Sequence, residues 1–220
     1  RGAIYDDMNR VLAALHSVEI ESVGLTDFGR PGSYYERQFA RWSQQYKASE
    51  LTPRPEMDRL MTWLGAAMPP EDGAVSLVHG DWRIDNLMFH PSEPRIIGVL
   101  DWEISTLGHP IADLAYQCMQ WRLPNQGAMR GLGGIDRVAH GLPDEAGYVA
   151  LYCERRGLEA VENWPFYLAF SFFRLIAILQ GVVRRAHDGN ASNPERAQEM
   201  EAAIPLLAAM ATDIIDKDRA

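Results

Sequence analysis

The stretch that decides the fold of this chain is VHGDWRIDNL, residues 78–87, followed by IIGVLDWE, residues 96–103. Both contain short β-branched or apolar runs bounded by turn residues, which favours small strands at residues 75–78, 87–89 and 95–100. These runs are too short and too close together for a β-sandwich. We therefore expect a few small strands that carry a loop of polar side chains.

The polar residues of these two stretches follow a definite order. Asp81 comes two residues after a histidine, Asn86 follows five residues later, and Asp101 ends an apolar strand. The order and spacing match the template of phosphoryl transfer, in which an aspartate accepts a hydroxyl proton while an asparagine and a second aspartate hold magnesium. We therefore predict Asp81 as the catalytic base and Asn86 and Asp101 as the magnesium ligands.

Phosphoryl transfer explains why these residue types are needed. The reaction requires an in-line hydroxyl, an acceptor for its proton, and cations over the phosphate oxygens. Mg²⁺ prefers hard oxygen ligands, and a carboxylate with an amide oxygen supplies two of them while phosphates and water fill the other positions. Arg83, two residues after the predicted base, is a second catalytic candidate because it could steady the transferring phosphate. A surface salt bridge is the alternative for this arginine.

Four further polar residues have both a structural and a functional interpretation. For His79 a hydrogen-bonded structural role is favoured over acid–base catalysis, and for Asp85 a loop-capping role is favoured. Glu103 is either a third metal ligand or a carboxylate that holds its loop by hydrogen bonds. Asp113 lies in the first turn of a predicted helix, where it either complements the helix dipole or anchors the backbone of the catalytic loop. We favour the anchor.

The rest of the chain is predicted to be mainly helical, which gives an α+β fold. The predicted helices lie at about residues 4–18, 33–47, 55–68, 111–121, 144–156 and 164–187, and from 193 onward. Ser33 and Glu36 are expected to cap the second helix as a capping box. The polar residues of the first helix are expected to face away from its apolar stripe: Asp6, Asp7, Asn9 and Arg10. Residues 122–143 are expected to form a long irregular connection.

Composition and charge narrow the class of protein. A formal net charge of −9 argues against a nucleic-acid-binding surface. Residues 164–183 are apolar, but Arg174 lies in their middle and Pro165 near their start, so a buried core helix is favoured over a membrane span. The two cysteines, Cys118 and Cys153, are expected to be buried free thiols. We expect a soluble, cytoplasmic protein with a small-molecule partner.

Two other sequence signals suggest a different metal motif or a different enzyme class, and both are rejected. Residues 27–29 spell DFG, the metal motif of protein kinases, but they precede the predicted catalytic loop, and the glycines and proline around them indicate a turn. A metal-dependent phosphoesterase would also use His, Asp and Asn, but such enzymes gather more histidines around their metals. His90, His109 and His140 lack suitable neighbours in the sequence.

With these motifs the chain resembles the aminoglycoside phosphotransferase and choline kinase family, whose members share a kinase-like fold. The segments at residues 79–86, 101–103 and 108–115 are most similar to the branch found alone in bacteria or fused to acyl-CoA dehydrogenases. The resemblance implies that residues 1–220 form the C-terminal lobe of that fold, with the catalytic and metal loops at residues 75–113. It also implies ATP and Mg²⁺ as cofactors, and transfer of the γ-phosphoryl group to a hydroxyl of a small molecule. A hydroxyacyl compound is the preferred acceptor.

One departure from the family pattern concerns the ATP-binding lobe. A family member begins with a small β-rich lobe whose strand lysine grips the phosphates, whereas Lys47, the first lysine here, lies in a helical pattern. We therefore expect the N-terminal lobe to be absent from these residues, and the chain alone to have negligible kinase activity. A non-catalytic, pseudokinase-type binding module is the alternative. The intact Asp81, Asn86 and Asp101 weigh against it.

Overall fold

A computed structural model describes residues 1–127, 129–190 and 193–218 of the chain. Its elements in chain order are α1 (Gly2–His16), α2 (Tyr34–Ser49), α3 (Pro55–Ala66), β1 (Ser76–Val78), the 3₁₀ turn η1 (Ile84–Asn86), β2 (Leu87–Phe89), β3 (Ile96–Val99), β4 (Thr106–Gly108), α4 (Ile111–Arg122), α5 (Glu145–Arg156), α6 (Trp164–His187) and α7 (Pro194–Asp218). The predicted fold class, mainly helical α+β with a few short strands, is confirmed.

The chain divides into two compact units. The first comprises Arg1–Gly32, Glu71–Cys118 and Ile135–Glu162, and the second comprises Ser33–Pro70, Met119–Gly134 and Asn163–Ala220. All the residues predicted for the functional site belong to the first unit. That residues 1–220 form a single lobe stays a prediction.

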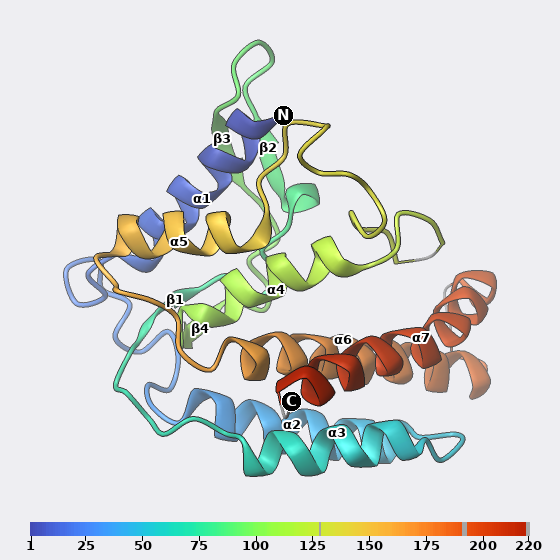
Figure 1. The fold of residues 1–220 in the computed structure, drawn as a ribbon. Coiled ribbons are helices and arrows are strands. Elements are labelled where there is room, and N and C mark those ends of the chain that lie inside the picture. The colour runs from blue at the N-terminus through green and yellow to red at the C-terminus, as the bar shows by residue number, and fades with distance from the viewer. Residues whose placement is uncertain (128, 191–192, 219–220) are drawn as a thin grey trace. The chain divides into compact units, whose positions relative to one another are not determined.

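Helix α1 packs against several elements of the first unit. It contacts α5 as well as strands β1 and β3, and Figure 1 shows α1 and α5 side by side. The apolar side chains of Met8 and Leu12 are buried, at 1% and 0% exposure. Helix α5 begins at the N-cap Asp144, whose side chain accepts a hydrogen bond from the Gly147 amide, and ends at Gly157 with φ of 68°.

The strands of the first unit form two small antiparallel pairs that position the loops between them. Strand β1 pairs with β4, with Leu77 opposite Leu107, and β2 pairs with β3, with Leu87 opposite Val99. The sequence predicted β1, β2 and β3 within one residue of their ends but missed β4. The loops that follow β1 and β3 each begin at the end of a short strand. Because the paired strand fixes the direction of β1 or β3, both loops start from a defined position.

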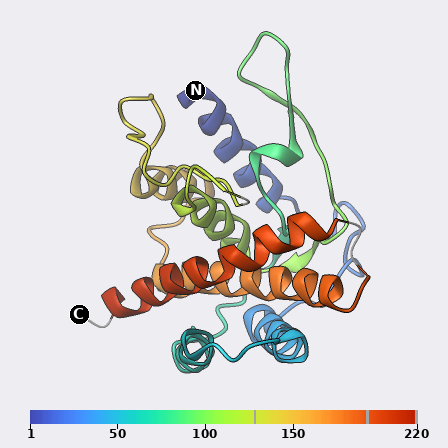
Figure 2. The same ribbon diagram turned by 90° about the vertical axis from the view of Figure 1, so that its right-hand side faces the viewer.

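In the second unit, helices α2, α3, α6 and α7 pack together. Helices α6 and α7 lie side by side, and α2 and α3 lie along one side of that pair (Figures 1 and 2). Helix α6 is long and apolar enough to cross a membrane, but 89% of its most apolar stretch is buried, as expected for a core helix. Helix α7 starts after Asn193, whose side chain accepts a hydrogen bond from the Arg196 amide at 3.0 Å.

Two sequence predictions about helix caps and faces were wrong. Ser33 is the N-cap residue of α2, but among the described residues its side chain makes no hydrogen bond that caps the helix, and its φ is 44°. In α1, Asp6 and Arg10 are exposed as expected, whereas Asp7 and Asn9 are buried, at 9% and 0% exposure.

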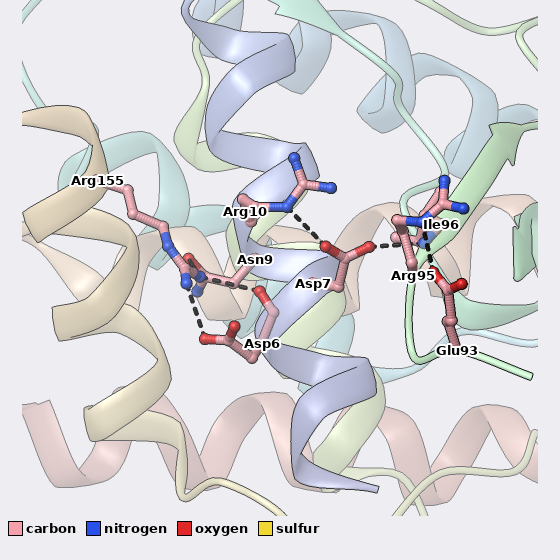
Figure 3. Close-up of polar contacts among 8 residues, drawn as sticks. All are labelled: Asp6, Asp7, Asn9, Arg10, Glu93, Arg95, Ile96 and Arg155. Carbon is pink, nitrogen blue, oxygen red and sulfur yellow. Dashed lines mark hydrogen bonds and ion pairs between the residues drawn. The ribbon is translucent and has the colours of Figure 1, made fainter. Parts of the chain in front are cut away.

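The buried polar residues of α1 satisfy main-chain groups of neighbouring elements (Figure 3). Asp7 accepts hydrogen bonds from the Ile96 amide and from the Arg10 side chain, each at 2.6 Å. The Asn9 side chain donates to the Tyr148 carbonyl at 2.9 Å and accepts from Arg155 at 3.0 Å. Helical periodicity identifies the buried face by its apolar residues, and therefore misses polar residues whose partners lie in distant parts of the sequence.

Other expectations from the sequence are confirmed. The DFG segment at residues 27–29 lies in a turn and bend, and Gly29 passes so close to Leu107 that a side chain there would meet its amide. Cys118 and Cys153 are buried free thiols. In the described part of residues 122–143 the chain has neither helix nor strand after Arg122, apart from an isolated bridge between Pro124 and Gly133.

Candidate active site

The backbone of the predicted catalytic loop is anchored by a buried carboxylate. Asp113, in the first turn of α4 and 1% exposed, accepts hydrogen bonds from the amides of His79 at 2.7 Å and Gly80 at 2.8 Å. One oxygen of the carboxylate serves each amide. A buried amide without a partner is costly, so this pairing fixes the chain immediately before Asp81. The anchoring role predicted for Asp113 is confirmed.

His79 links the catalytic loop to the loop that follows β3. Its Nε2 lies 2.8 Å from the Leu100 carbonyl oxygen, which can only accept, so Nε2 carries the proton. Its Nδ1 then accepts from the Asp81 amide at 3.2 Å. The ring also packs against Trp102, with 4.9 Å between ring centroids. Both ring nitrogens are therefore engaged, which confirms the structural role and argues against the phosphoesterase alternative, in which this histidine would bind metal.

Asp81 and Asn86 meet across the loop. The Asn86 amide nitrogen donates to the Asp81 carbonyl oxygen and to its carboxylate Oδ2, both at 2.9 Å. Because both partners only accept, the nitrogen of the side-chain amide must face Asp81. The amide oxygen, on the other side of the same group, is then the atom that can meet a cation. Both residues are partly exposed, so neither is sealed in the interior.

Leu100, the residue before Asp101, makes hydrogen bonds to both Asn86 and His79. The Leu100 amide donates to the Asn86 carbonyl at 2.9 Å, and the Leu100 carbonyl accepts from His79. Asp101 itself is exposed and has φ of 65°, a left-handed conformation that non-glycine residues seldom adopt. The surrounding bonds hold the chain in this conformation. The chain is thus tied to Asn86 and His79 immediately before the second predicted magnesium ligand.

Gly80 permits the two loops to approach each other. Its φ is 87°, and a Cβ atom built there would lie 2.8 Å from the carbonyl oxygen of Ile104. Only glycine combines this backbone conformation with so close a neighbour. The catalytic loop and the loop that carries Asp101 are therefore in van der Waals contact at this point.

Arg83 and Asp85 form an ion pair at the start of η1. The Arg83 Nε donates to Asp85 Oδ2 at 2.9 Å, and its Nη2 contacts the same oxygen. The pair is partly exposed, with 36% of the Arg83 side chain and 65% of the Asp85 side chain accessible. The surface salt bridge considered for Arg83 is therefore present, and Asp85 is its partner. Glu103 is exposed in the turn after Asp101.

The donor set fits magnesium better than a transition metal. Asn86 offers an amide oxygen and Asp101 a carboxylate, which are the hard oxygen ligands that Mg²⁺ prefers. Within residues 1–127, 129–190 and 193–218, no group of three or more His, Cys, Asp or Glu side chains is arranged to hold a metal ion. A site of this type takes part of its coordination shell from phosphates and water, so two protein ligands suffice.

Sequence reasoning missed one residue of this region, His16. The His16 Nε2 lies 3.2 Å from Asp113 Oδ2, and its Nδ1 lies 2.7 Å from the Tyr152 hydroxyl. His16 is 2% exposed and belongs to the same helix face as Met8 and Leu12, at a spacing of four residues. That spacing was a readable signal, because a histidine on an apolar stripe requires a polar partner in the core.

Comparison with known proteins gives the family. Residues 1–148 match the model of the phosphotransferase enzyme family. A solved structure from Ralstonia eutropha, assigned to the aminoglycoside phosphotransferases, is 50% identical and superposes with a TM-score of 0.92 over 98% of this chain and 65% of its own. Mouse acyl-CoA dehydrogenase family member 10 is 43% identical over 99% of this chain, but the match spans only 20% of the mouse protein.

A more distant structure supports the fold alone. Choline kinase from Cryptosporidium parvum is 12% identical and superposes with a TM-score of 0.51, over 98% of this chain and 66% of the kinase. The chain thus spans less than two thirds of the Ralstonia protein and a fifth of the mouse protein. The resemblance expected from the sequence, including the relation to proteins named for acyl-CoA dehydrogenases, is confirmed, and the chain belongs to the phosphotransferase enzyme family.

Proposed function

We propose that the whole protein containing this chain is an ATP-dependent phosphotransferase that moves the γ-phosphoryl group to a hydroxyl of a small molecule. Asp81 is the base, and Asn86 and Asp101 hold Mg²⁺. The observation that carries the proposal is the hydrogen bond from the Asn86 amide to the Asp81 carboxylate, together with the two backbone bonds of Leu100. The first bond joins two of the three proposed residues and the other two tie the chain just before Asp101 to the same loop, which supports a common site.

Each residue of the site has its own role in the proposed reaction. Asp81, fixed in orientation by Asn86, accepts the proton of the attacking hydroxyl through its carboxylate. The Asn86 amide oxygen and the Asp101 carboxylate would bind the cation, whose positive charge offsets the negative charge of the phosphates. His79 and Asp113 hold the loop backbone and thereby fix the base and the cation site relative to each other. They touch neither phosphate nor acceptor.

To contact the transferring phosphate, the Arg83 side chain would have to exchange its ion-pair partner. In the structure its guanidinium is paired with Asp85, and both side chains are partly exposed. An exposed pair of this kind contributes about 0–1 kcal/mol, so phosphate oxygens with more negative charge can compete for the arginine. We propose that Arg83 leaves Asp85 to contact the transferring phosphate.

A hydroxyacyl compound is the acceptor we propose. Apolar side chains are exposed in and beside the two loops: Ile84 at 43%, Leu100 at 45%, Trp102 at 39% and Ile104 at 45%. Exposed apolar surface near a polar site is typical of proteins that bind an apolar ligand, which supports this choice. The relatives named as acyl-CoA dehydrogenase family members support an acyl compound. A cationic acceptor, which the net charge of −9 would suit, is the alternative.

The experiment is an acceptor screen with the whole protein, in which ADP release is followed for wild type and Asp81→Asn. Loss of the general base lowers the rate by about 10²- to 10⁴-fold. Asp27→Asn is the matched control, because Asp27 is an exposed aspartate in the turn at residues 27–29. We expect the 220 residues alone to have negligible turnover.

Three outcomes are informative. Phosphoryl transfer that Asp81→Asn abolishes and Asp27→Asn preserves supports the proposal. Transfer that survives Asp81→Asn at the wild-type rate contradicts the assignment of the base. ATP binding without transfer to any hydroxyl compound favours a non-catalytic binding module.

A further inference from the structure

We infer that His16 is a positioning residue for the catalytic loop, acting through Asp113. This inference rests on the proposed function, since it concerns the loop that carries Asp81. It starts from a buried series of hydrogen bonds that joins three helices: Tyr152 in α5, His16 at the end of α1, and Asp113 at the start of α4.

All three side chains are removed from water. Tyr152 is 0% exposed, His16 2% and Asp113 1%. Polar groups buried to this degree are retained only with partners, because each unpaired group costs about 1–3 kcal/mol in lost hydration. The three side chains therefore satisfy one another's hydrogen-bonding groups, and these bonds fix their relative positions.

The direction of each hydrogen bond follows from the acceptors. Asp113 Oδ2 can only accept, so the His16 Nε2 carries the proton toward it, and Nδ1 accepts from the Tyr152 hydroxyl. Burial lowers the pKa of His16, although the hydrogen bond and charge of Asp113 oppose this effect. Burial also raises the pKa of Tyr152, which keeps its hydroxyl a donor. A neutral histidine thus has one donor and one acceptor, and both are used.

Asp113 consequently receives donors from two directions. Its Oδ2 accepts from His16 and from the His79 amide, and its Oδ1 accepts from the Gly80 amide. The bond from His16 restrains the rotation of the carboxylate, which would otherwise depend on the two loop amides alone. Since those amides directly precede Asp81, the orientation of the carboxylate determines where the base lies.

The main chain of His16 holds the other side of the same loop. The Ser76 hydroxyl, in strand β1, donates to the His16 carbonyl oxygen at 2.9 Å and is itself 2% exposed. His16 therefore contacts the strand that enters the catalytic loop through its backbone and the anchor of that loop through its ring. This double contact distinguishes it from a histidine that only fills the core.

The test compares His16→Leu with His16→Gln in the whole protein. Leucine fills the space without a donor, whereas glutamine has an amide nitrogen that can reach Asp113 in place of Nε2. Hydrogen exchange of the His79 and Gly80 amides is measured first, because it requires neither nucleotide nor acceptor. We expect His16→Leu to speed their exchange about ten- to a hundredfold, the worth of one hydrogen bond to a charged group, and His16→Gln to restore most of the protection.

The kinetic readout separates positioning from folding. In His16→Leu, kcat for phosphoryl transfer should fall about tenfold or more while KM for ATP changes little, because the misplaced base acts mainly in the transition state. Should His16→Leu fail to fold, Tyr152→Phe, which removes the donor to His16 along with a hydrogen bond to Arg156, should increase exchange at the same two amides. His140→Leu is the matched control, because His140 is exposed.

Each result decides the matter. Faster exchange at His79 and Gly80 with lowered kcat, both reversed by His16→Gln, supports the inference. Wild-type exchange at these amides, or wild-type kcat, in a folded His16→Leu or Tyr152→Phe protein overturns the inference, even if the melting temperature falls. Asp81→Asn measured in parallel reports on the proposed function separately: if Asp81→Asn keeps full activity, the proposed function fails whatever the exchange data show.

Discussion

Replacing Asp7 with alanine is expected to destabilise the first unit far more than replacing its neighbour Asp6. The two aspartates are adjacent in α1 but have different surroundings (Figure 3). Asp7 is 9% exposed and accepts the Ile96 amide at 2.6 Å, so it holds strand β3 against the helix. Asp6 is exposed and pairs with Arg155 at 2.7 Å.

The magnitude follows from the partners that each change leaves behind. Removing the Asp7 carboxylate leaves a buried amide without its charged acceptor, which costs about 1.5–3 kcal/mol. The bond to the half-exposed Arg10 adds about 0–1 kcal/mol. We therefore expect Asp7→Ala to lower the free energy of unfolding by about 1.5–4 kcal/mol. Asp6→Ala removes an exposed ion pair and should cost less than about 1 kcal/mol.

The dependence on pH gives a second signature of Asp7. Burial alone would raise the pKa of Asp7, but hydrogen bonds from Arg10 and the Ile96 amide hold it below its ordinary value. A carboxyl whose pKa is lower in the folded state stabilises the fold fully above its unfolded pKa of about 3.9, and this stabilisation is lost as the pH falls through the folded pKa. Asp7→Ala should lack this contribution to acid unfolding.

The assay combines urea unfolding with hydrogen exchange at the Ile96 amide, because exchange reports on the first unit directly. Asp7→Asn keeps an acceptor and should fall between wild type and Asp7→Ala. Equal unfolding free energies for Asp7→Ala and Asp6→Ala, with unchanged exchange at Ile96, would refute the reasoning that this carboxylate holds β3.

Three further predictions concern the site itself. Gly80→Ala should lower the free energy of unfolding by at least about 1–3 kcal/mol in urea titrations, because φ is 87° and the new Cβ would lie 2.8 Å from the Ile104 carbonyl oxygen; wild-type stability would show that the two loops are not in contact. Asp113→Asn should cost about 1–3 kcal/mol by thermal unfolding, since an amide group cannot accept from all three donors; an unchanged midpoint would contradict the anchor. Asp85→Asn should change stability by less than about 1 kcal/mol while raising ATP affinity by freeing Arg83, measured by calorimetry on the whole protein; weaker ATP binding would contradict the proposed exchange of partners.

Much of the fold was readable because the signals are local. The helices predicted at residues 144–156 and from 193 onward are present as α5 and α7, and each begins within one residue of the predicted start. The spacing of Asp81 and Asn86 is set by a single short loop, so their meeting also follows from neighbouring residues. The roles of base and magnesium ligand stay predictions.

What could not be predicted depends on partners that are distant in sequence. Asp7 and Asn9 look like exposed polar residues until β3 and α5 supply the main-chain groups they satisfy. Strand β4 is too short to be recognised by composition and exists because it pairs with β1. The hydrogen-bonding role of His16 can be recognised only in the folded chain, where α4 and α5 place Asp113 and Tyr152 beside its ring.

The central claim is that Asn86 and Asp101 hold the cation of a magnesium nucleotide beside Asp81. A crystal structure of the whole protein with Mg²⁺ and a non-hydrolysable ATP analogue tests it most directly. We predict a magnesium ion about 2.0–2.1 Å from the Asn86 amide oxygen and from an Asp101 carboxylate oxygen, with the γ-phosphate facing Asp81. A nucleotide whose metal is bound by other residues, with Asn86 and Asp101 remote from it, would contradict the claim.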